Sequence, residues 1–318
     1  MRRLENRVPW RFFLCALRLA LQQRPDCIVC GHVSLGPMAF ALSRIIRRPY
    51  ISIVYGIDCW GDLFPQDEWC LKKSKRIISI SHWTKNILLE RGYNSKIIDI
   101  IHPIISSDLI NSRYLSGPRN IFTLLTISRL DRQERYKGHD DVLEALGVVT
   151  QDRPDLKVRY LIQGTGDDQG RLIEKVNNLG LTQYVQFIES TPLRSQLVDQ
   201  YSQADVFIMP SQFGKLNGRW KGEGFGIVYA EAGALGIPSI AYNCGGATDI
   251  IEHKKSGLLV TPGNIAELAH AIIFCADNQG VVSQMGAYAQ QRVYEQFTSE
   301  QMDRSSLAML VRVGLGAE

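Results

Sequence analysis

Two glutamates eight positions apart, Glu223 and Glu231, stand in the most informative segment of this chain. Glu223 is framed by glycines, and Glu231 is followed by residues that favour a helix. A helix that begins near Gly226 would direct its free N–H groups and the positive end of its dipole at a ligand above the loop. Segment 222–231 therefore offers N–H donors for a phosphate and carboxylates for hydroxyl groups, although a buried helix start with two solvated glutamates is the simpler alternative.

Two cations, Arg129 and Lys137, lie in the segment that follows the apolar run 121–127. This segment connects an expected strand to an expected helix. Arg can hold a diphosphate through two parallel hydrogen bonds, and Lys acts as a point charge. The remaining charges nearby are expected to be solvated or to begin a helix, and none is expected to hold a metal ion: Arg132, Glu134, Arg135, Asp140, Asp141, Asp167 and Asp168.

Glycine pairs follow two other expected strands, as Gly164 with Gly166 and as Gly245 with Gly246. Each pair alone is weak evidence, because a short glycine motif only permits a close approach of the backbone. The carboxyl ends of parallel strands meet at one edge of a sheet. We therefore expect the glycine pairs, the two cations and segment 222–231 to gather at one edge.

Apolar patterns alternate between strands and helices along the chain, which predicts an α/β fold with parallel sheets. An irregular segment, 108–120, separates two series of elements. The first series consists of helix 8–23, strand 27–30, helix 36–47, strand 50–55, a polar aromatic loop, strand 76–81, helix 82–91 and strand 96–101. The second consists of strand 121–127, helix 138–150, strand 157–163, helix 168–179, strand 184–188, helix 193–202, strand 205–209, helix 226–236, strand 238–242 and helices 264–277, 289–297 and 299–313.

Charge is distributed unevenly over the 318 residues. Residues 1–117 carry 17 Lys or Arg and 9 Asp or Glu, whereas the rest carries 19 and 23. A basic half favours an anionic partner such as a membrane surface or a phosphate-bearing acceptor, although arginines on helix surfaces explain it equally well. No apolar run is long enough for a transmembrane helix, no signal peptide is predicted, and seven cysteines indicate reduced thiols.

Residues 121 to about 275 resemble the retaining GT-B glycosyltransferases of family 4, the glycosyl transferases group 1. The matching segments occur in the order typical of the family: 128–130 with 136–138, 161–166, 204–211, 222–231, and 245–246 with 256–260. The resemblance implies two Rossmann-like domains that face each other across a cleft. We assign residues 1–117 to an acceptor-side domain, 118–296 to a donor-binding domain, and 297–318 to a helix that crosses back to the first.

The resemblance also implies roles for individual residues. Arg129 and Lys137 would hold the diphosphate of a nucleotide-sugar donor and stabilise it as it leaves, so that no metal and no other cofactor is expected. Glu223 would contact the transferred sugar, and Glu231 the ribose. The remaining donor-binding positions are Gly164, Ile188 near the base, and the backbone of Gly224, Phe225, Gly226 and Ile227.

The N-terminal half matches the family less closely. Many members carry His where Tyr55 stands, so His32, Tyr55 and Asp58 are the candidates for the acceptor side. Members usually begin with a further strand and a glycine loop, and we therefore expect an incomplete, shortened N-terminal domain.

Together these features predict a cytoplasmic, membrane-peripheral, retaining hexosyltransferase of exopolysaccharide or envelope polysaccharide assembly. The expected donor is a UDP-hexose such as UDP-glucose, the acceptor is a glycan or lipid-linked glycan, and no nucleic acid partner is expected. Two alternatives stay open: a donor-binding subunit with impaired catalysis, and an epimerase or phosphorylase of the GT-B fold.

Overall fold

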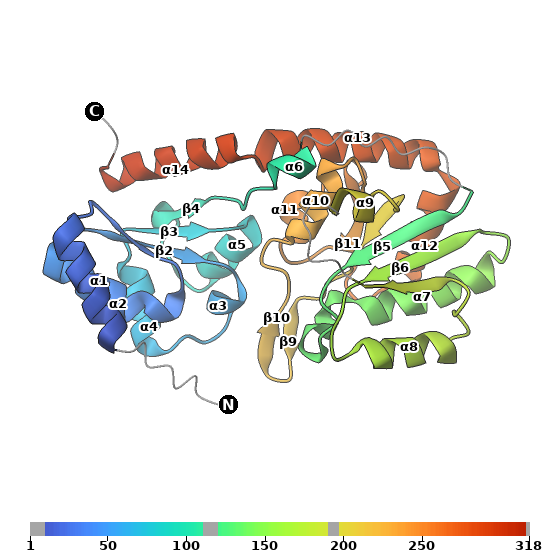
Figure 1. Ribbon diagram of the computed structural model, residues 1–318, viewed down its shortest axis with the longest axis horizontal. Helices are drawn as coiled ribbons and strands as arrows, with labels where there is room; N and C mark the ends of the chain where they lie inside the picture. Colours follow the sequence, from blue (N-terminus) through green and yellow to red (C-terminus); the bar gives the residue numbers. More distant parts are fainter. Residues whose placement is uncertain (1–9, 111–119, 190–196, 316–318) are drawn as a thin grey trace. The chain divides into compact units, whose positions relative to one another are not determined.

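The computed structural model describes residues 10–110, 120–189 and 197–315. Most of the predicted irregular segment 108–120, the expected domain boundary at 117 and the start of predicted helix 193–202 lie outside this range. The first residues of that segment are not irregular, because they belong to helix α6 (Ser107–Ile110). The chain forms two units, which Figure 1 shows: unit 1 comprises Met1–His102 with Met302–Glu318, and unit 2 comprises Pro103–Gln301. Each unit is described separately below.

Unit 1 is built on a parallel sheet with the strand order β1-β2-β3-β4. The strands are β1 (Ile28–Cys30), β2 (Tyr50–Val54), β3 (Arg76–Ser79) and β4 (Ile98–Ile100). Since side chains alternate along a strand, Cys30 and Tyr50 pack under Ala39 of α2 (Gly36–Ile46), whereas Ile51 faces the other side. Helix α1 (Trp10–Gln23) lies beside α2, and α5 (His82–Glu90) packs on β3 and β4.

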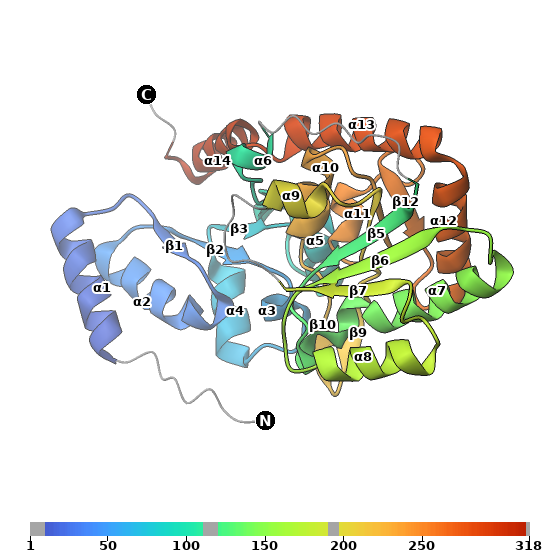
Figure 2. The ribbon, with the colours of Figure 1, turned by 45° about the vertical axis from the view of Figure 1, so that its right-hand side comes forward.

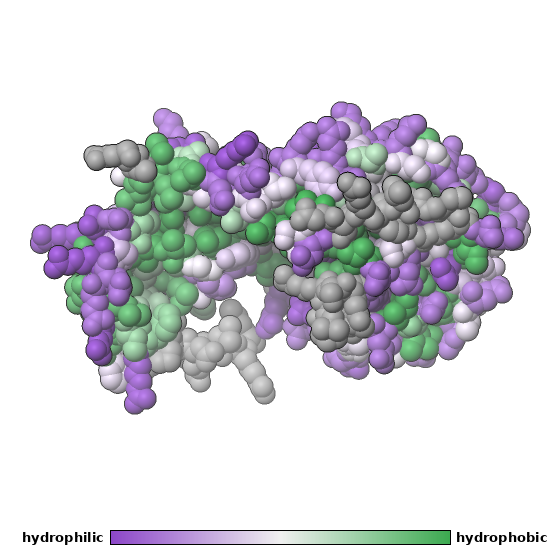
Figure 3. Space-filling model, turned by 45° about the horizontal axis from the view of Figure 1, so that its top comes forward, coloured by the Kyte–Doolittle hydropathy of each residue, from purple (hydrophilic) through white to green (hydrophobic). Residues whose placement is uncertain are grey.

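The second face of this sheet is covered by the end of the chain. Helix α14 (Ser299–Val313) places Met309 and Val313 in a buried cluster with Ile51, Ile78 and Ile101. Its outer side leaves Leu307 and Val311 exposed, and Figure 3 shows apolar side chains gathered over this face of unit 1.

The prediction of a loop after Tyr55 is wrong, because this segment forms two helices, α3 (Ile57–Trp60) and α4 (Pro65–Lys73). Helix α4 has Pro65 in its first turn with Asp67, and its last turn carries Lys73. These are ordinary signals for the start and end of a helix, but α4 is short and lacks a strong apolar period.

Unit 2 contains a parallel six-stranded sheet with the order β12-β11-β8-β5-β6-β7. Its strands are β5 (Phe122–Ile127), β6 (Val158–Gln163), β7 (Val185–Ile188), β8 (Val206–Ile208), β11 (Ser239–Tyr242) and β12 (Gly257–Val260). From β5 the chain first builds outward to β6 and β7 and then returns to β8 on the other side. The topological switch point, where ligands bind in open α/β sheets, therefore lies between β5 and β8.

Helices cover both faces of this sheet, as Figures 1 and 2 show. One face carries α7 (His139–Asp152), α8 (Gln169–Asn178) and α12 (Ile265–Asp277). On the other face, α9 (Leu197–Tyr201) and α10 (Ile227–Ala234) place the rings of Tyr201 and Tyr229 at 5.9 and 5.6 Å from that of Phe207. Helix α13 (Gln279–Gln296) packs on α10.

The two parallel sheets confirm the α/β fold class, but some elements of unit 2 differ from expectation. Helix α13 begins at Gln279, ten residues before its predicted start. A hairpin of β9 (Gly214–Leu216) and β10 (Arg219–Lys221) was not predicted, although its Asn217-Gly218 turn is a strong hairpin signal. Among the described residues, no helix is both long enough and apolar enough to span a bilayer.

Candidate functional site

The loops that leave β5 and β8 carry most of the predicted site. Ile127 ends β5 and Ile208 ends β8, and these strands are neighbours. Loop 128–138 leads from β5 through the 3-10 segment η3 (Arg132–Lys137) to α7, and loop 209–226 leads from β8 to α10. Both loops therefore begin at the switch point of unit 2.

Arg129 and Lys137 meet at a single carboxylate. Arg129 Nη2 donates a hydrogen bond to Glu134 Oε1, and Lys137 Nζ lies 3.0 Å from Glu134 Oε2. The side chain of Arg129 is 72% exposed, whereas those of Lys137 and Glu134 are only 13% and 12% exposed. The expectation that Glu134 is a solvated charge is therefore wrong. The sequence contained a signal for this contact, the i,i+3 spacing of Glu134 and Lys137.

The acidic residues near the starts of α7 and α8 also have partners, and Asp168 is the N-cap residue of α8, as its expected place at a helix start predicts. Asp168, with a side chain 3% exposed, accepts hydrogen bonds from Arg135 Nε at 3.0 Å and from Arg171 Nη2 at 2.7 Å. Arg171 and Lys175 also contact Asp140, at 2.7 and 2.9 Å. Burial raises the pKa of Asp140, but hydrogen bonds from Arg171 and Lys175 outweigh it and lower this pKa to about 2. This network anchors η3 to α7 and α8.

The expectation that Asp140 and Asp141 form a solvated pair is also wrong for Asp141. Its Oδ2 accepts hydrogen bonds from the hydroxyl of Tyr242 at 2.6 Å and from Gln212 Nε2 at 2.9 Å. Asp141 therefore ties the start of α7 to the ends of β11 and β8.

A buried histidine fixes the position of the loop that carries Arg129. His139 is 4% exposed, and its Nε2 lies 2.9 Å from the hydroxyl of Ser128. Burial, assisted by the charge of Lys137, lowers the pKa of His139 to about 4. The imidazole is therefore neutral near pH 7.

Two glycines allow the site loops to touch each other. Gly138 has a φ of +81°, and a Cβ there would lie 2.2 Å from the carbonyl oxygen of Pro210. At Gly164 a Cβ would lie 1.8 Å from the carbonyl oxygen of Ser128. The close backbone approach expected at Gly164 is thus a contact with Ser128 of the same chain.

Glu223 lies partly buried beside the same charges. Its pKa is raised, mainly by burial and also by the charge of Glu134, while Lys137, Arg129 and a hydrogen bond with Tyr136 oppose the rise. The backbone N–H of Gly246 donates to the carbonyl of Glu223 at 2.8 Å. The structure therefore brings Glu223, Arg129 and Lys137 into one cluster.

Tyr136 is a further member of this cluster, and it was not predicted. Burial, and then the charge of Glu223, raise the pKa of Tyr136, so its phenol stays protonated and can donate to that carboxylate. Tyr136 immediately precedes Lys137 in η3, but nothing in its sequence spacing indicates a contact with Glu223.

The remaining donor-side positions follow in loop 209–226 and α10. Gly224 and Phe225 precede Gly226, the N-cap residue of α10. Ile227 begins the helix and is 42% exposed. Glu231 lies about one turn further, where its Oε2 accepts a hydrogen bond of 2.8 Å from Tyr201.

Ile188 lies elsewhere on the sheet edge, at the end of β7. Its carbonyl oxygen accepts a hydrogen bond of 3.1 Å from the backbone N–H of Gly164. These two predicted positions are therefore direct neighbours.

The three acceptor-side candidates follow β1 and β2 in unit 1. His32 is exposed and caps a short 3-10 turn, accepting from the N–H of Ser34 at 3.2 Å. Tyr55 is 47% exposed, and its N–H donates to Asp58 Oδ1 at 2.9 Å. Within the described parts of the chain, the buried Oδ2 of Asp58 has no hydrogen-bond partner. Burial raises the pKa of Asp58, and the nearby His32 opposes this.

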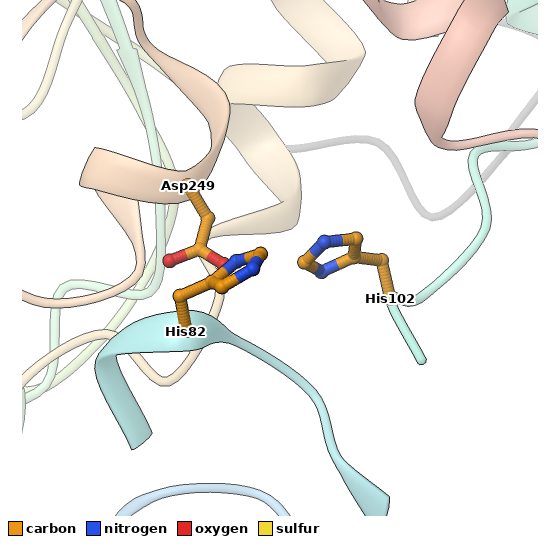
Figure 4. A group of neighbouring side chains, drawn as sticks. All are labelled: His82, His102 and Asp249. Carbon is orange, nitrogen blue, oxygen red and sulfur yellow. The ribbon is translucent and has the colours of Figure 1, made fainter. Parts of the chain in front are cut away.

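A histidine pair in unit 1 was not predicted. His82 begins α5 and His102 follows β4, with ring centroids 5.7 Å apart. His102 Nδ1 lies 3.0 Å from the carbonyl oxygen of Ile80. Figure 4 shows the two imidazoles of this pair. The two histidines follow β3 and β4, which are consecutive and paired, so the adjacent carboxyl ends of these strands were the signal that could have indicated the pair.

Comparison with known proteins relates the chain to enzymes that transfer sugars. The family model "Glycosyl transferases group 1" matches residues 120–292. A similar protein is an uncharacterized glycosyltransferase of Haemophilus influenzae, 27% identical over 211 residues, which are 66% of this chain and 54% of that protein. The match thus spans about half of that relative's length.

Two solved structures share the arrangement of elements. A glycosyltransferase from Rickettsia africae ESF-5 has a TM-score of 0.82 at 19% identity, covering 98% of this chain and 84% of that one. HepE from Anabaena, solved in complex with UDP, has a TM-score of 0.79 at 20% identity, covering 95% and 82%. At such low identities these likenesses show the fold.

Proposed function

The chain belongs to the glycosyl transferases group 1 family and has the GT-B fold, and we propose that it is a retaining hexosyltransferase. In this proposal, a hexose moves from a nucleotide-diphosphate donor to a glycan or lipid-linked acceptor. The observation that carries it is the cluster of Arg129, Lys137 and Glu223 at the switch point of unit 2. It combines cations for a diphosphate with a carboxylate for sugar hydroxyls.

Arg129 and Lys137 would act on the leaving group. When the bond from the anomeric carbon to the diphosphate oxygen breaks, negative charge accumulates on that diphosphate. Fixed cations stabilise such charge strongly, because they need no reorganisation during the reaction. The N-terminus of α10 would add its partial positive charge if the diphosphate lies above Gly226.

Glu223 and Glu231 would bind hydroxyl groups at the two ends of the donor. Glu223 lies beside the cations, which suits the transferred sugar. Glu231 lies one turn into α10, which suits the ribose, with Ile188 and Gly164 on the side of the base. We assign the Glu223 carboxylate to sugar hydroxyls and not to attack on the anomeric carbon, so we favour front-face substitution with retention of configuration.

A UDP-hexose such as UDP-glucose is the proposed donor, and the UDP complex of the HepE protein supports it. On unit 1, His32, Tyr55 and Asp58 are proposed to face the acceptor, and the unpaired Oδ2 of Asp58 is suited to accept a hydrogen bond from a hydroxyl group.

We further propose a role in exopolysaccharide or envelope polysaccharide assembly at the cytoplasmic surface of a membrane. The basic charge of residues 1–117 favours anionic lipid. Part of its basic segment, residues 1–9, lies outside the described residues. Salt-sensitive sedimentation with anionic vesicles would support this location, and sedimentation equal to that with neutral vesicles would contradict it.

Calorimetric titration with UDP, GDP, ADP and their glucose or mannose conjugates tests the proposed function. We expect one nucleotide to bind and its conjugate with one sugar to bind more tightly. The double variant Arg129→Ala with Lys137→Ala should bind neither the nucleotide nor its sugar conjugate. Glu144→Gln is a suitable control, because Glu144 belongs to the same unit and forms an ion pair with Lys175 of α8. A wild-type protein that binds none of these ligands would contradict the proposal.

Product analysis separates the proposal from its alternatives. Products formed from the donor alone would indicate an epimerase, and products that require inorganic phosphate would indicate a phosphorylase. Donor binding without turnover over a broad acceptor screen would favour a donor-binding subunit.

A further inference from the structure

Glu134 occupies a position between the two cations that the proposed function assigns to the diphosphate. Its Oε1 accepts a hydrogen bond from Arg129, and its Oε2 lies 3.0 Å from Lys137 Nζ. The carboxylate is only 12% exposed. One buried anion thus contacts both cations.

The ion pairs of Glu134 with Arg129 and Lys137 leave donors of both cations that a diphosphate could use. Although Lys137 is near, Glu134 Oε2 is buried and accepts no hydrogen bond from any residue in the described ranges. Arg129 keeps 72% of its side chain exposed, and a guanidinium carries five N–H donors. A diphosphate has more acceptor oxygens and more charge than one carboxylate, so it can compete for both cations.

The backbone of Glu134 is held in place. Its N–H donates to the carbonyl of Asp131 at 2.7 Å, and the next residue, Arg135, is fixed by buried Asp168. Displacement of the carboxylate therefore requires rotation of its side chain but no movement of η3.

We propose that Glu134 is an internal counter-anion of the diphosphate site, which a ligand must displace and which returns when the product leaves. This inference rests on one part of the proposed function, the assignment of Arg129 and Lys137 as diphosphate ligands. It makes Glu134 a positioning residue. The carboxylate keeps the cations together in the empty site, weakens the binding of diphosphates, and accelerates the release of the nucleoside diphosphate product.

The test compares wild-type protein with Glu134→Gln and uses inorganic pyrophosphate and UDP as probes. Loss of the competing charge should tighten binding of both by about five-fold or more, and should slow UDP dissociation in surface plasmon resonance by a similar factor. Glu144→Gln should leave both affinities unchanged, because it removes a carboxylate that is paired with Lys175 of α8. Glu134→Asp, which keeps the charge but shortens its reach, should give intermediate affinity.

Equal or weaker binding of pyrophosphate and UDP by Glu134→Gln overturns the inference, provided its melting temperature matches that of the wild type. If Glu134→Gln is less stable than the wild type, Glu134→Asp is compared with the wild type instead. Unchanged or weaker binding of both probes by Glu134→Asp then overturns the inference. The outcome for the proposed function is distinct. If wild-type protein binds a nucleotide-sugar and Glu134→Gln binds no tighter, only the inference fails. If pyrophosphate binding tightens but no nucleotide binds, the proposed function fails and the counter-anion assignment stands.

Discussion

The buried imidazole of His139 links the site loop to acid stability. The folded protein holds this group neutral down to about pH 4, whereas the unfolded chain takes up a proton below about pH 6.5. The unfolding free energy should therefore decrease by up to roughly 3 kcal/mol as the pH falls through this window. Urea unfolding at several pH values would measure it. His139→Leu should flatten the dependence, and a variant of the exposed His270 should not; an unchanged slope in His139→Leu would contradict the assignment.

Glu223 is expected to show the opposite pH dependence. Its pKa is raised from an ordinary value of 4.5, chiefly by burial, so folding favours the protonated carboxyl. The unfolding free energy should then fall as the pH rises through the window from 4.5 to the raised pKa. Glu223→Gln should be more stable than the wild type near pH 7, by about 1 kcal/mol. It should also bind UDP-glucose less tightly while UDP affinity changes little. Thermal melts and titrations measure both effects, and a less stable Glu223→Gln would refute the first.

At the scale of elements, the join between loop 128–138 and loop 209–226 depends on Gly138. Its positive φ and its contact with Pro210 leave no space for a Cβ. Gly138→Ala should cost roughly 2–4 kcal/mol of unfolding free energy. Gly147 is a matched control inside α7, where a Cβ would meet nothing within 4 Å. Gly147→Ala should be neutral or stabilising by up to about 1 kcal/mol. Similar losses in both variants, measured by denaturant unfolding, would show that the join is not constrained.

The elements that sequence analysis predicted well are those with a strong local pattern. The apolar runs of β5 and β6 and the glycine start of α10 are visible within ten residues. Helix α4 and the hairpin of β9 and β10 are short and polar, so their pattern resembles a loop until their neighbours are known.

The same distinction applies to the site. Arg129, Lys137 and Glu223 could be proposed because each follows an expected strand or lies in a glycine-rich segment. Glu134 had one local signal, its i,i+3 spacing to Lys137. Tyr136 had none, since its contact with Glu223 depends on how η3 folds against loop 209–226. Asp168 lies at the start of α8 as expected, but its burial could not be predicted for a similar reason, because it depends on arginines from two separate elements.

At the scale of the whole chain, residues from opposite ends of the sequence pack together in one unit. The sheet of unit 1 is made by the first hundred residues, yet one of its faces is buried by Met309 and Val313 near the other end. The chain therefore passes twice between the units, near His102 and near Gln301. Periodicity can predict that α14 is an amphipathic helix, but not which sheet it covers.

This division into units predicts where a donor nucleotide is bound. Every residue proposed to contact the donor belongs to unit 2, whereas the acceptor-side candidates His32, Tyr55 and Asp58 belong to unit 1. A ligand raises the stability of the structure it binds, by about 2.7 kcal/mol at a hundred times its Kd. Amide hydrogen exchange with saturating UDP should therefore slow most in segments 128–138 and 222–231. The Arg129→Ala variant at the same UDP concentration is the control and should show no such protection. Protection strongest in segments 31–36 and 55–60 would place the nucleotide on unit 1, and the assignment of donor and acceptor sides would have to be reversed.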